Sequence, residues 1–147
     1  MPVVMPEPDR RVLARRDRIV AALSAIVPGE GVIATEREMR PYESDGLTAY
    51  RALPMVVVLP ETTDQVSRVL ACCCAEDIKV VPRGAGTSLS GGALPLTDGV
   101  LLGMAKFNRI KEIDFDSRVV VAEPGVTNLA VTQAVEHAGF YYAPDPS

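Results

Sequence analysis

Two short apolar runs separated by a helical pattern constrain the fold of this chain more than any other feature. Met55–Leu59 (MVVVL) lies between two prolines, and Ile78–Val81 (IKVV) is the second run. Between them Val66, Val69, Leu70 and Cys73 recur at helical spacing and are expected to form a buried stripe. They follow Thr62 and Gln65, which are spaced as in a capping box. A strand, a helix and a strand in this order predict a βαβ unit with parallel pairing of its two strands.

A glycine-rich segment follows the second of these strands. Pro82–Gly92 (PRGAGTSLSGG) holds four glycines. Glycine allows positive φ angles and close approach of another group to the main chain. Successive backbone N–H groups in such a loop form a concave site that suits an anion. Because open α/β sheets bind ligands at the carboxyl ends of their strands, we interpret this loop as a cradle for a diphosphate.

Counting along the loop excludes the two commonest nucleotide motifs. A P-loop would need lysine where Gly92 stands, although Gly86–Gly91 has the glycine spacing of that motif. The Rossmann fingerprint starts correctly at Gly84, but Leu89 takes the place of its third glycine. The remaining alternative from the residues alone is a glycine-rich surface turn that binds no ligand.

The rest of the chain predicts a mixed α and β fold, an α+β (α/β) sandwich. Residues 1–40 are expected to form an arm and a helix, and residues 41–147 the ligand-binding region. Tyr42, Asp45, Tyr50 and Arg51 either approach a ligand or lie in surface loops, and surface loops are the favoured interpretation. The later elements are predicted from alternation, turn residues and caps. They are a first helix at Asp9–Val27, a strand at Gly99–Ala105, a hairpin of Ile110–Phe115 with Arg118–Ala122, and a last helix that begins after Thr127 and ends at Gly139.

Composition narrows the possible partners. The net charge of −4 and the pI near 5.0 argue against nucleic acid as a partner. Met55–Leu59 is far shorter than the roughly 20 residues of a membrane span. The three adjacent cysteines, Cys72–Cys74, point about 100° apart on a helix, so we expect packing rather than metal or redox roles and a reducing cytoplasm. Five arginines on the first helix form either a docking patch or a solvated face, and the solvated face is the favoured interpretation.

Five segments in order resemble one family of flavoproteins. They are Tyr42–Leu47, Pro82–Gly92, Gly91–Leu96, Val121–Val126 and Tyr141–Ser147. The glycine loop resembles the diphosphate-binding loop of FAD-binding domains of the vanillyl-alcohol-oxidase and p-cresol-methylhydroxylase (PCMH) type. Together the segments are similar to the flavin subunits of bacterial glycolate oxidases, which are relatives of FAD-linked D-lactate dehydrogenases. One departure is Ser88, where relatives often have glycine.

The resemblance implies a set of cofactor-binding residues. The backbone of the glycine loop would wrap the FAD diphosphate, with hydroxyl donors from two of its residues and a proline that fixes its entry. A second flavin-contacting stretch would lie at the end of the chain. The implied residues are Pro82, Arg83, Gly84, Ala85, Gly86, Thr87, Ser88, Leu89, Gly91, Pro144, Asp145 and Ser147. Because the loop lacks His and Cys, we expect FAD to be bound non-covalently. A surface or helix-capping role is expected for the one histidine, His137.

The resemblance also implies an activity. We expect an FAD-dependent oxidoreductase acting on the CH–OH group of a small 2-hydroxy acid such as glycolate or D-lactate. Its electrons would leave through a partner such as an iron–sulfur subunit, or to a quinone. Its location would be the cytoplasm, or the inner membrane surface through partners. In this family the catalytic residues lie later in the chain, so we expect an incomplete FAD domain, part of a longer enzyme, with no catalytic or metal residues here and no activity alone. The alternatives are another oxidoreductase of the superfamily, acting on an alcohol, a sugar lactone or a cell-wall precursor, and a non-catalytic binding module.

Overall fold

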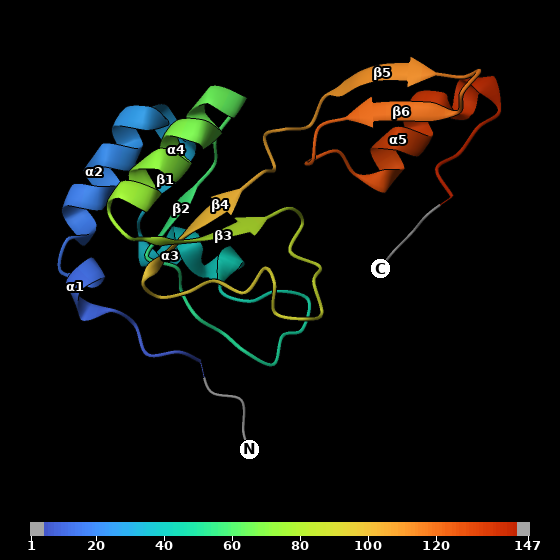
Figure 1. Cartoon of the computed structure of the whole chain (residues 1–147). Coiled ribbons are helices and arrows are strands. Elements are labelled where there is room, and N and C mark those ends of the chain that lie inside the picture. The colour runs from blue at the N-terminus through green and yellow to red at the C-terminus, as the bar shows by residue number, and fades with distance from the viewer. Residues whose placement is uncertain (1–4, 144–147) are drawn as a thin grey trace.

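The computed structural model describes residues 5–143, which form two units joined by the segment 104–109 (Figure 1). The first unit is a four-stranded sheet with helices, and the second is a hairpin with one helix. The elements of the first are α1 (Arg10–Leu13), α2 (Arg16–Ile26), η1 (Gly29–Gly31), β1 (Val32–Ile33), α3 (Glu36–Met39), η2 (Arg40–Tyr42), β2 (Val56–Val58), α4 (Thr63–Ala75), β3 (Lys79–Arg83) and β4 (Gly99–Gly103). Those of the second are β5 (Ile110–Asp114), β6 (Val119–Ala122), α5 (Asn128–Val135) and η3 (Glu136–Ala138). The mixed α and β class is confirmed.

The strand order of the first sheet is β1-β2-β4-β3. Strands β2, β4 and β3 run parallel, whereas β1 is antiparallel to β2. The predicted direct pairing of the two strands that flank α4 is wrong, because β4 lies between them. All five residues of β4 are buried, and a strand covered on both faces and both edges takes the central position of a sheet.

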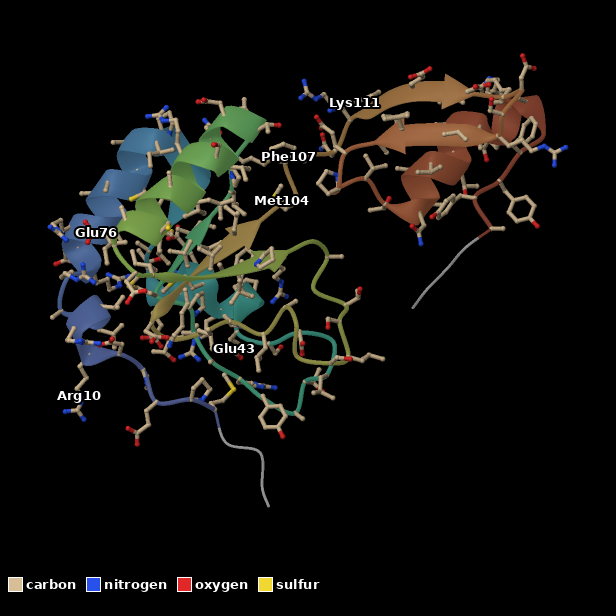
Figure 2. All side chains as sticks on the ribbon, viewed as in Figure 1. Arg10, Glu43, Glu76, Met104, Phe107 and Lys111 are labelled. Carbon is tan, nitrogen blue, oxygen red and sulfur yellow. The ribbon has the colours of Figure 1, made fainter. Side chains whose placement is uncertain are left out.

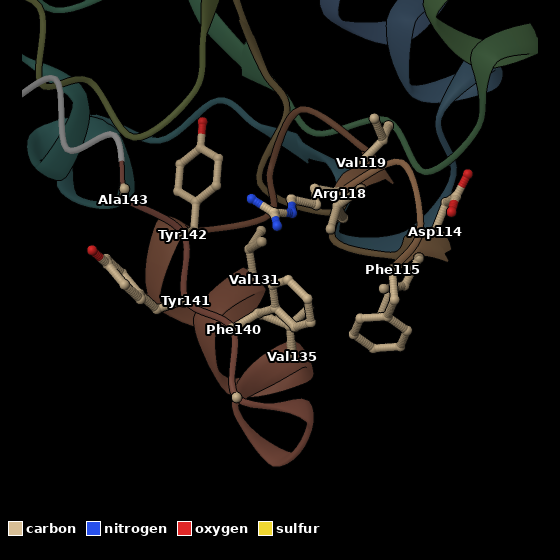
Figure 3. Close-up of a pocket in the computed structure, with 13 residues that line it drawn as sticks. Asp114, Phe115, Arg118, Val119, Val131, Val135, Phe140, Tyr141, Tyr142 and Ala143 are labelled. Atoms are coloured by element: carbon tan, nitrogen blue, oxygen red, sulfur yellow. The ribbon is translucent and has the colours of Figure 1, made fainter.

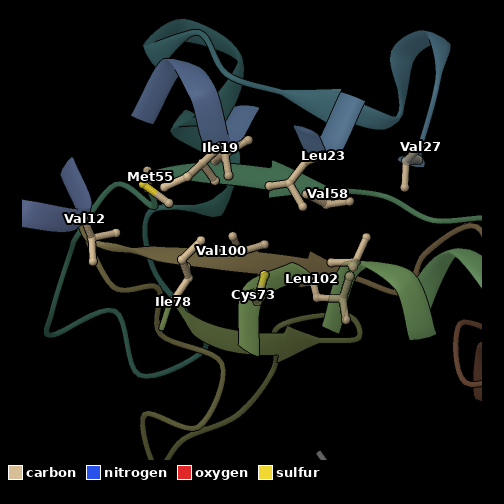
Figure 4. Close-up of a cluster of buried hydrophobic side chains, with 12 residues drawn as sticks. Val12, Ile19, Leu23, Val27, Met55, Val58, Cys73, Ile78, Val100 and Leu102 are labelled. Atoms are coloured by element: carbon tan, nitrogen blue, oxygen red, sulfur yellow. The ribbon is translucent and has the colours of Figure 1, made fainter. Parts of the chain in front are cut away.

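Alternating residues of β2 and β4 form cores on the two faces of this sheet. Val58, Val100 and Leu102 pack with Leu23 of α2 and Cys73 of α4 (Figure 4). The intervening residues, Val57 and Leu101, pack on the other face against Met39 of α3. The period of two along each strand thus explains why these strands are continuously apolar.

The predicted single helix from Asp9 to Val27 is wrong, since it breaks between α1 and α2. Asp9 caps α1 as expected, accepting from the backbone N–H of Arg11 at 2.8 Å. Near the break, the guanidinium groups of two arginines bind a residue that is far away in the sequence. Arg15 and Arg18 both bond the carboxylate of Glu76, and Arg15 also donates to the Glu76 carbonyl at 3.0 Å. These arginines therefore hold α2 against the end of α4, which removes them from a docking patch.

Helix α4 begins as predicted and buries a narrower stripe than predicted. Thr62 Oγ1 accepts from the N–H of Gln65 at 3.2 Å, while Gln65 Oε1 accepts from Glu61 rather than from Thr62. Leu70, predicted to be buried, is 43% exposed. Cys73 is buried, which raises the pKa of its thiol to about 11, whereas Cys74 is exposed rather than packed. Among residues 5–143 no group of three metal-ligating side chains is present.

The second unit follows the predicted hairpin and helix. Val119 of β6 pairs with Asp114 of β5. Helix α5 is capped by Thr127, whose Oγ1 accepts from the N–H of Ala130 at 3.1 Å. The helical segment ends at Gly139 with a φ of 79°, the left-handed position that was predicted. None of the helices in the described part of the chain is long and apolar enough to span a bilayer.

Candidate functional site: the glycine loop and its supports

The glycine loop starts where β3 ends, at the carboxyl edge of the parallel sheet. Gly86 and Gly91 both have a φ of 77°, which L-residues rarely adopt. Within residues 5–143 the backbone N–H groups from Gly84 to Leu89 donate no hydrogen bond to any protein group. Unpaired amides on a loop of this shape suit an anion with several oxygens. The loop therefore fits the diphosphate predicted for it.

Arg83 is the last residue of β3, and its side chain supports the loop from behind. One guanidinium nitrogen, Nη1, donates to the carbonyl of Ser44 at 2.7 Å, with longer contacts to those of Tyr42 at 3.3 Å and Ala93 at 3.4 Å. The guanidinium also lies against Gly86, where a Cβ atom would overlap it. Arg83 has no carboxylate partner among the described residues. It thus places a positive charge without a salt-bridge partner next to the cradle.

The segment Tyr42–Leu47 forms a second wall of the loop. A Cβ atom on Gly46 would lie 2.7 Å from the carbonyl oxygen of Thr87, so the two segments touch through their backbones. Asp45, which the sequence suggested as a surface-loop residue, is only 5% exposed. Its Oδ1 accepts from the N–H of Leu47 at 3.0 Å, and its buried Oδ2 has no partner in the described part of the chain.

Of the predicted cofactor residues outside the loop itself, the structure describes Pro82. Pro82 lies within β3, directly before the loop. The predicted second stretch, Pro144, Asp145 and Ser147, lies outside the described residues. The chain just before it runs back along α5, because the N–H of Tyr142 donates to Thr132 Oγ1 at 3.1 Å. These assignments stay predictions, and so does the division of the chain at residue 40.

Sequence reasoning missed a clasp at Glu123, between the loop that follows β6 and the segment 104–109 that connects the two units. Its side chain is 4% exposed and accepts from both the backbone N–H and the guanidinium of Arg109, at 3.0 and 2.8 Å. Arg109 holds the pKa of the Glu123 carboxyl below its usual value. Gly125 then donates to the carbonyl of Phe107 at 2.7 Å, and a Cβ on it would lie 2.5 Å from the carbonyl oxygen of Met104. Figure 2 labels Met104 and Phe107 in the stretch between the units.

This clasp had only a weak signal in the sequence. Val121–Val126 (VAEPGV) is one of the segments that resemble the flavoprotein family, but its residues alone predict no structural role for Glu123. An acidic residue before Pro-Gly suggests an ordinary exposed turn. Its carboxylate is bound by Arg109, which is 14 residues away.

A cavity of about 380 Å³ lies in the second unit, away from the glycine loop (Figure 3). Its walls are mainly apolar and include Val131 and Val135 of α5 with Phe140. Phe140 also packs on Phe115 with ring centroids 5.6 Å apart. His137 lies at the surface with its ring edge-on to Phe115, as the predicted surface role requires. We interpret these walls as the hydrophobic core of the second unit, because few polar groups converge there.

Sequence comparison identifies relatives of known activity. The chain is 52% identical over 132 residues to glycolate oxidase subunit GlcD of Escherichia coli, covering 90% of this chain and 26% of that protein. It is 40% identical over 106 residues to GlcD of Bacillus subtilis, covering 72% of this chain and 23% of the relative. It is 34% identical to mitochondrial D-2-hydroxyglutarate dehydrogenase of Bos taurus, covering 82% and 22%. The chain thus spans about a quarter of the length of these relatives.

Structural comparison supports the same fold. p-Cresol methylhydroxylase matches with a TM-score of 0.76 at 23% identity, covering 93% of this chain and 27% of that structure. Alkyldihydroxyacetonephosphate synthase matches with a TM-score of 0.73 at 15% identity, covering 99% and 28%. The sequence model of an FAD binding domain matches residues 54–147, which include β2, the glycine loop and the clasp. The chain therefore belongs to the family of FAD-binding domains of the PCMH type.

Proposed function

We propose that this chain is the FAD-binding part of a longer flavoenzyme that oxidises a small 2-hydroxy acid. The observation that carries the proposal is the glycine loop at the carboxyl end of β3, whose amides are unpaired and whose back is occupied by the Arg83 guanidinium. The relatives are named for glycolate and D-2-hydroxyglutarate, which supports one of these acids as the substrate, and D-lactate is the further candidate that the family resemblance implies. The CH–OH group of such an acid is the site of oxidation.

Bound FAD would supply the redox chemistry by accepting two electrons from the substrate. The residues of this chain bind and orient it. The loop amides hold the diphosphate, Arg83 offsets part of its negative charge, and the contact of Gly46 with Thr87 fixes the shape of the cradle. The carboxylate of a 2-hydroxy acid needs cationic groups, and its hydroxyl needs a base, and we propose that both come from a later part of the complete protein.

The proposal includes the setting of the enzyme. GlcD is named as a subunit of glycolate oxidase, so we propose that the complete protein assembles with other subunits, including an iron–sulfur subunit that receives the electrons. We also propose a cytoplasmic location, with attachment to the inner membrane through those subunits as the alternative. Tagged complete protein that purifies without any iron-containing partner from its native host would contradict this assembly.

Flavin content and activity test the proposal together. The complete protein that carries this chain is expected to purify yellow, to release its flavin on acid precipitation because the bond is non-covalent, and to reduce a dye acceptor with a 2-hydroxy acid. Residues 1–147 alone are expected to bind FAD weakly or not at all and to oxidise nothing. Colourless complete protein that takes up no added FAD would refute the cofactor. Activity only on alcohols or sugar lactones would assign another branch of the superfamily.

A matched glycine pair tests the loop itself. Gly86→Ala places a Cβ in the Arg83 guanidinium at a φ of 77°, a conformation that costs an L-residue about 1–2 kcal/mol. We therefore expect FAD affinity to fall about tenfold or more. The control is Gly92→Ala, where a Cβ would meet only Ser88 Oγ at 3.6 Å, an ordinary contact. Equal FAD affinity in both variants would remove the loop from the site.

A further inference from the structure

The buried carboxylate of Asp45 stands beside the glycine loop with one oxygen unused. The residue is 5% exposed, and Oδ1 is taken by the N–H of Leu47. The other oxygen, Oδ2, is shielded from solvent and has no hydrogen-bond partner among residues 5–143. An ionised oxygen that is removed from water without a donor is costly, because the lost hydration is not replaced. A group that supplies such a donor would therefore gain affinity from it.

The neighbours of Asp45 in sequence both touch the cradle. On one side, the carbonyl of Ser44 accepts from the Arg83 guanidinium at 2.7 Å. On the other side, Gly46 lies against the backbone carbonyls of Thr87 and Ser88 so closely that a Cβ would overlap the first of them. Asp45 is thus fixed between two contacts with the loop, and the carboxylate belongs to the wall of the site rather than to a remote part of the surface.

The charges around the loop decide which part of a cofactor suits this carboxylate. A diphosphate offers only acceptor oxygens, so it cannot donate to Oδ2 and is repelled by it. The hydroxyl groups next to a diphosphate in a flavin dinucleotide are donors. Dinucleotide sites of other folds use an acidic side chain on a sugar hydroxyl in the same way. The Arg83 guanidinium, which has no carboxylate partner in the described chain, offsets the negative charge nearby.

We propose that Asp45 Oδ2 accepts a hydrogen bond from a sugar or ribityl hydroxyl of the bound cofactor, next to the diphosphate held by the loop. This inference rests on the proposed function, and it assigns Asp45 a binding role that sequence reasoning had given to a surface loop. Asp45 then selects a hydroxyl-bearing dinucleotide over a bare diphosphate. The loop amides supply affinity for the anion, and Asp45 supplies discrimination.

The decisive variant is Asp45→Asn, measured in the complete protein. The amide oxygen of asparagine can still accept from Leu47, so the turn is kept, while the NH₂ group replaces the acceptor Oδ2 with a donor. FAD affinity is measured by flavin fluorescence quenching, and the affinity for inorganic pyrophosphate by competition. The control is Asp116→Asn, the same change at an exposed position of the β5–β6 turn. A thermal melt of each apoprotein checks that the variants are folded.

We expect Asp45→Asn to weaken FAD binding about ten- to a hundredfold, the range for a hydrogen bond to a charged group, and to leave pyrophosphate binding equal or tighter. Asp116→Asn is expected to change neither. Equal loss of both ligands would mean that Asp45 only supports the loop, and unchanged or tighter FAD binding would mean that it makes no such bond. Either result overturns the inference. Wild-type protein that binds pyrophosphate but no FAD would instead overturn the proposed function, and this inference with it.

Discussion

The two units of the chain differ in how completely they bury their apolar residues. In the first unit β4 is buried along its whole length, and helices α2 and α4 share one core with it. In the second unit β6 leaves Val119 and Val121 half exposed, and α5 covers only one side of a two-stranded sheet. A two-stranded hairpin is marginally stable by itself, because its hydrophobic face is small.

Because of this difference, the proposed binding loop belongs to the better-packed of the two units. The glycine loop and Arg83 are attached to the well-packed sheet, so their geometry is fixed by its core. The second unit is attached to that sheet through the segment 104–109, which Glu123 and Gly125 of the β6–α5 loop bind at Arg109 and Phe107. A cofactor that touches both units would depend on this clasp for their relative position. The following substitutions test the contrast, in order of expected effect.

The same deletion of two methyl groups distinguishes the cores of the two units. Val100→Ala in β4 removes a fully buried side chain, and Val119→Ala in β6 removes one that is 50% exposed. We expect the first to lower the free energy of unfolding by about 2–3 kcal/mol and the second by less than about 1 kcal/mol. Urea unfolding, monitored by peptide-resolved hydrogen exchange, measures the free energy of unfolding of each unit in both variants. Equal losses would mean that the second unit is packed as well as the first.

Gly125→Ala tests the clasp by steric overlap. Its Cβ would lie 2.5 Å from the carbonyl oxygen of Met104 and 2.7 Å from that of Phe107, and backbone atoms cannot move aside easily. Overpacking of this kind costs about 1–3 kcal/mol. We expect the backbone amide of Gly125 to exchange faster, because its bond to Phe107 opens. Normal protection of this amide would show that the connecting segment adapts. Gly92→Ala, whose Cβ would make only an ordinary contact with Ser88, is the control.

Two equivalent helix caps compare the units directly. Thr62→Ala and Thr127→Ala each remove one hydroxyl that accepts from a backbone N–H at 3.2 or 3.1 Å. Each loss is worth about 1 kcal/mol. We expect α4 to stay folded because α2 packs on it, and α5 to lose amide protection because its support is thinner. The contrast between the units breaks down if α4 frays as much as α5.

Acidification tests the clasp with the smallest expected effect, because the Arg109 guanidinium is 72% exposed and solvent screens it. The hydrogen bonds from Arg109 lower the pKa of Glu123 from its ordinary value of 4.5. A carboxyl with a lowered native pKa stabilises above its unfolded pKa, and that contribution is lost as the pH falls through the native value. We expect the exchange of amides near Glu123, corrected for the intrinsic rate, to rise below pH 4.5.

Glu123→Gln serves as the control for that titration. The amide keeps the size of the side chain and removes its charge, so the clasp should be loosened at neutral pH and show no further change on acidification. A variant with the wild-type pH profile would assign the acid sensitivity to another carboxyl. Asp98 is one such group, since burial raises its pKa but Lys79 and the N–H of Asp9 lower it below the usual value overall.

Most local features of the chain were predictable from neighbouring residues. The caps at Asp9, Thr62 and Thr127, the hairpin after Ile110 and the left-handed Gly139 all follow from turn and capping chemistry that spans a few positions. The glycine loop was likewise visible as a pattern, and so was its place after a strand. The break between α1 and α2 was not, and neither were the contacts of Arg15 and Arg18 beside it with Glu76, about 60 residues away.

The sequence by itself thus predicted most of the elements, the glycine loop and its place after a strand. Only the tertiary structure placed β4 between the strands that flank α4, because burial on both faces is a property of the whole sheet. It also placed Arg83 against Ser44, which is 39 positions away in the sequence. In the same way it buried Asp45 beside the loop and Glu123 against Arg109. These contacts need partners distant in the chain, and no local pattern encodes which distant residue will supply them.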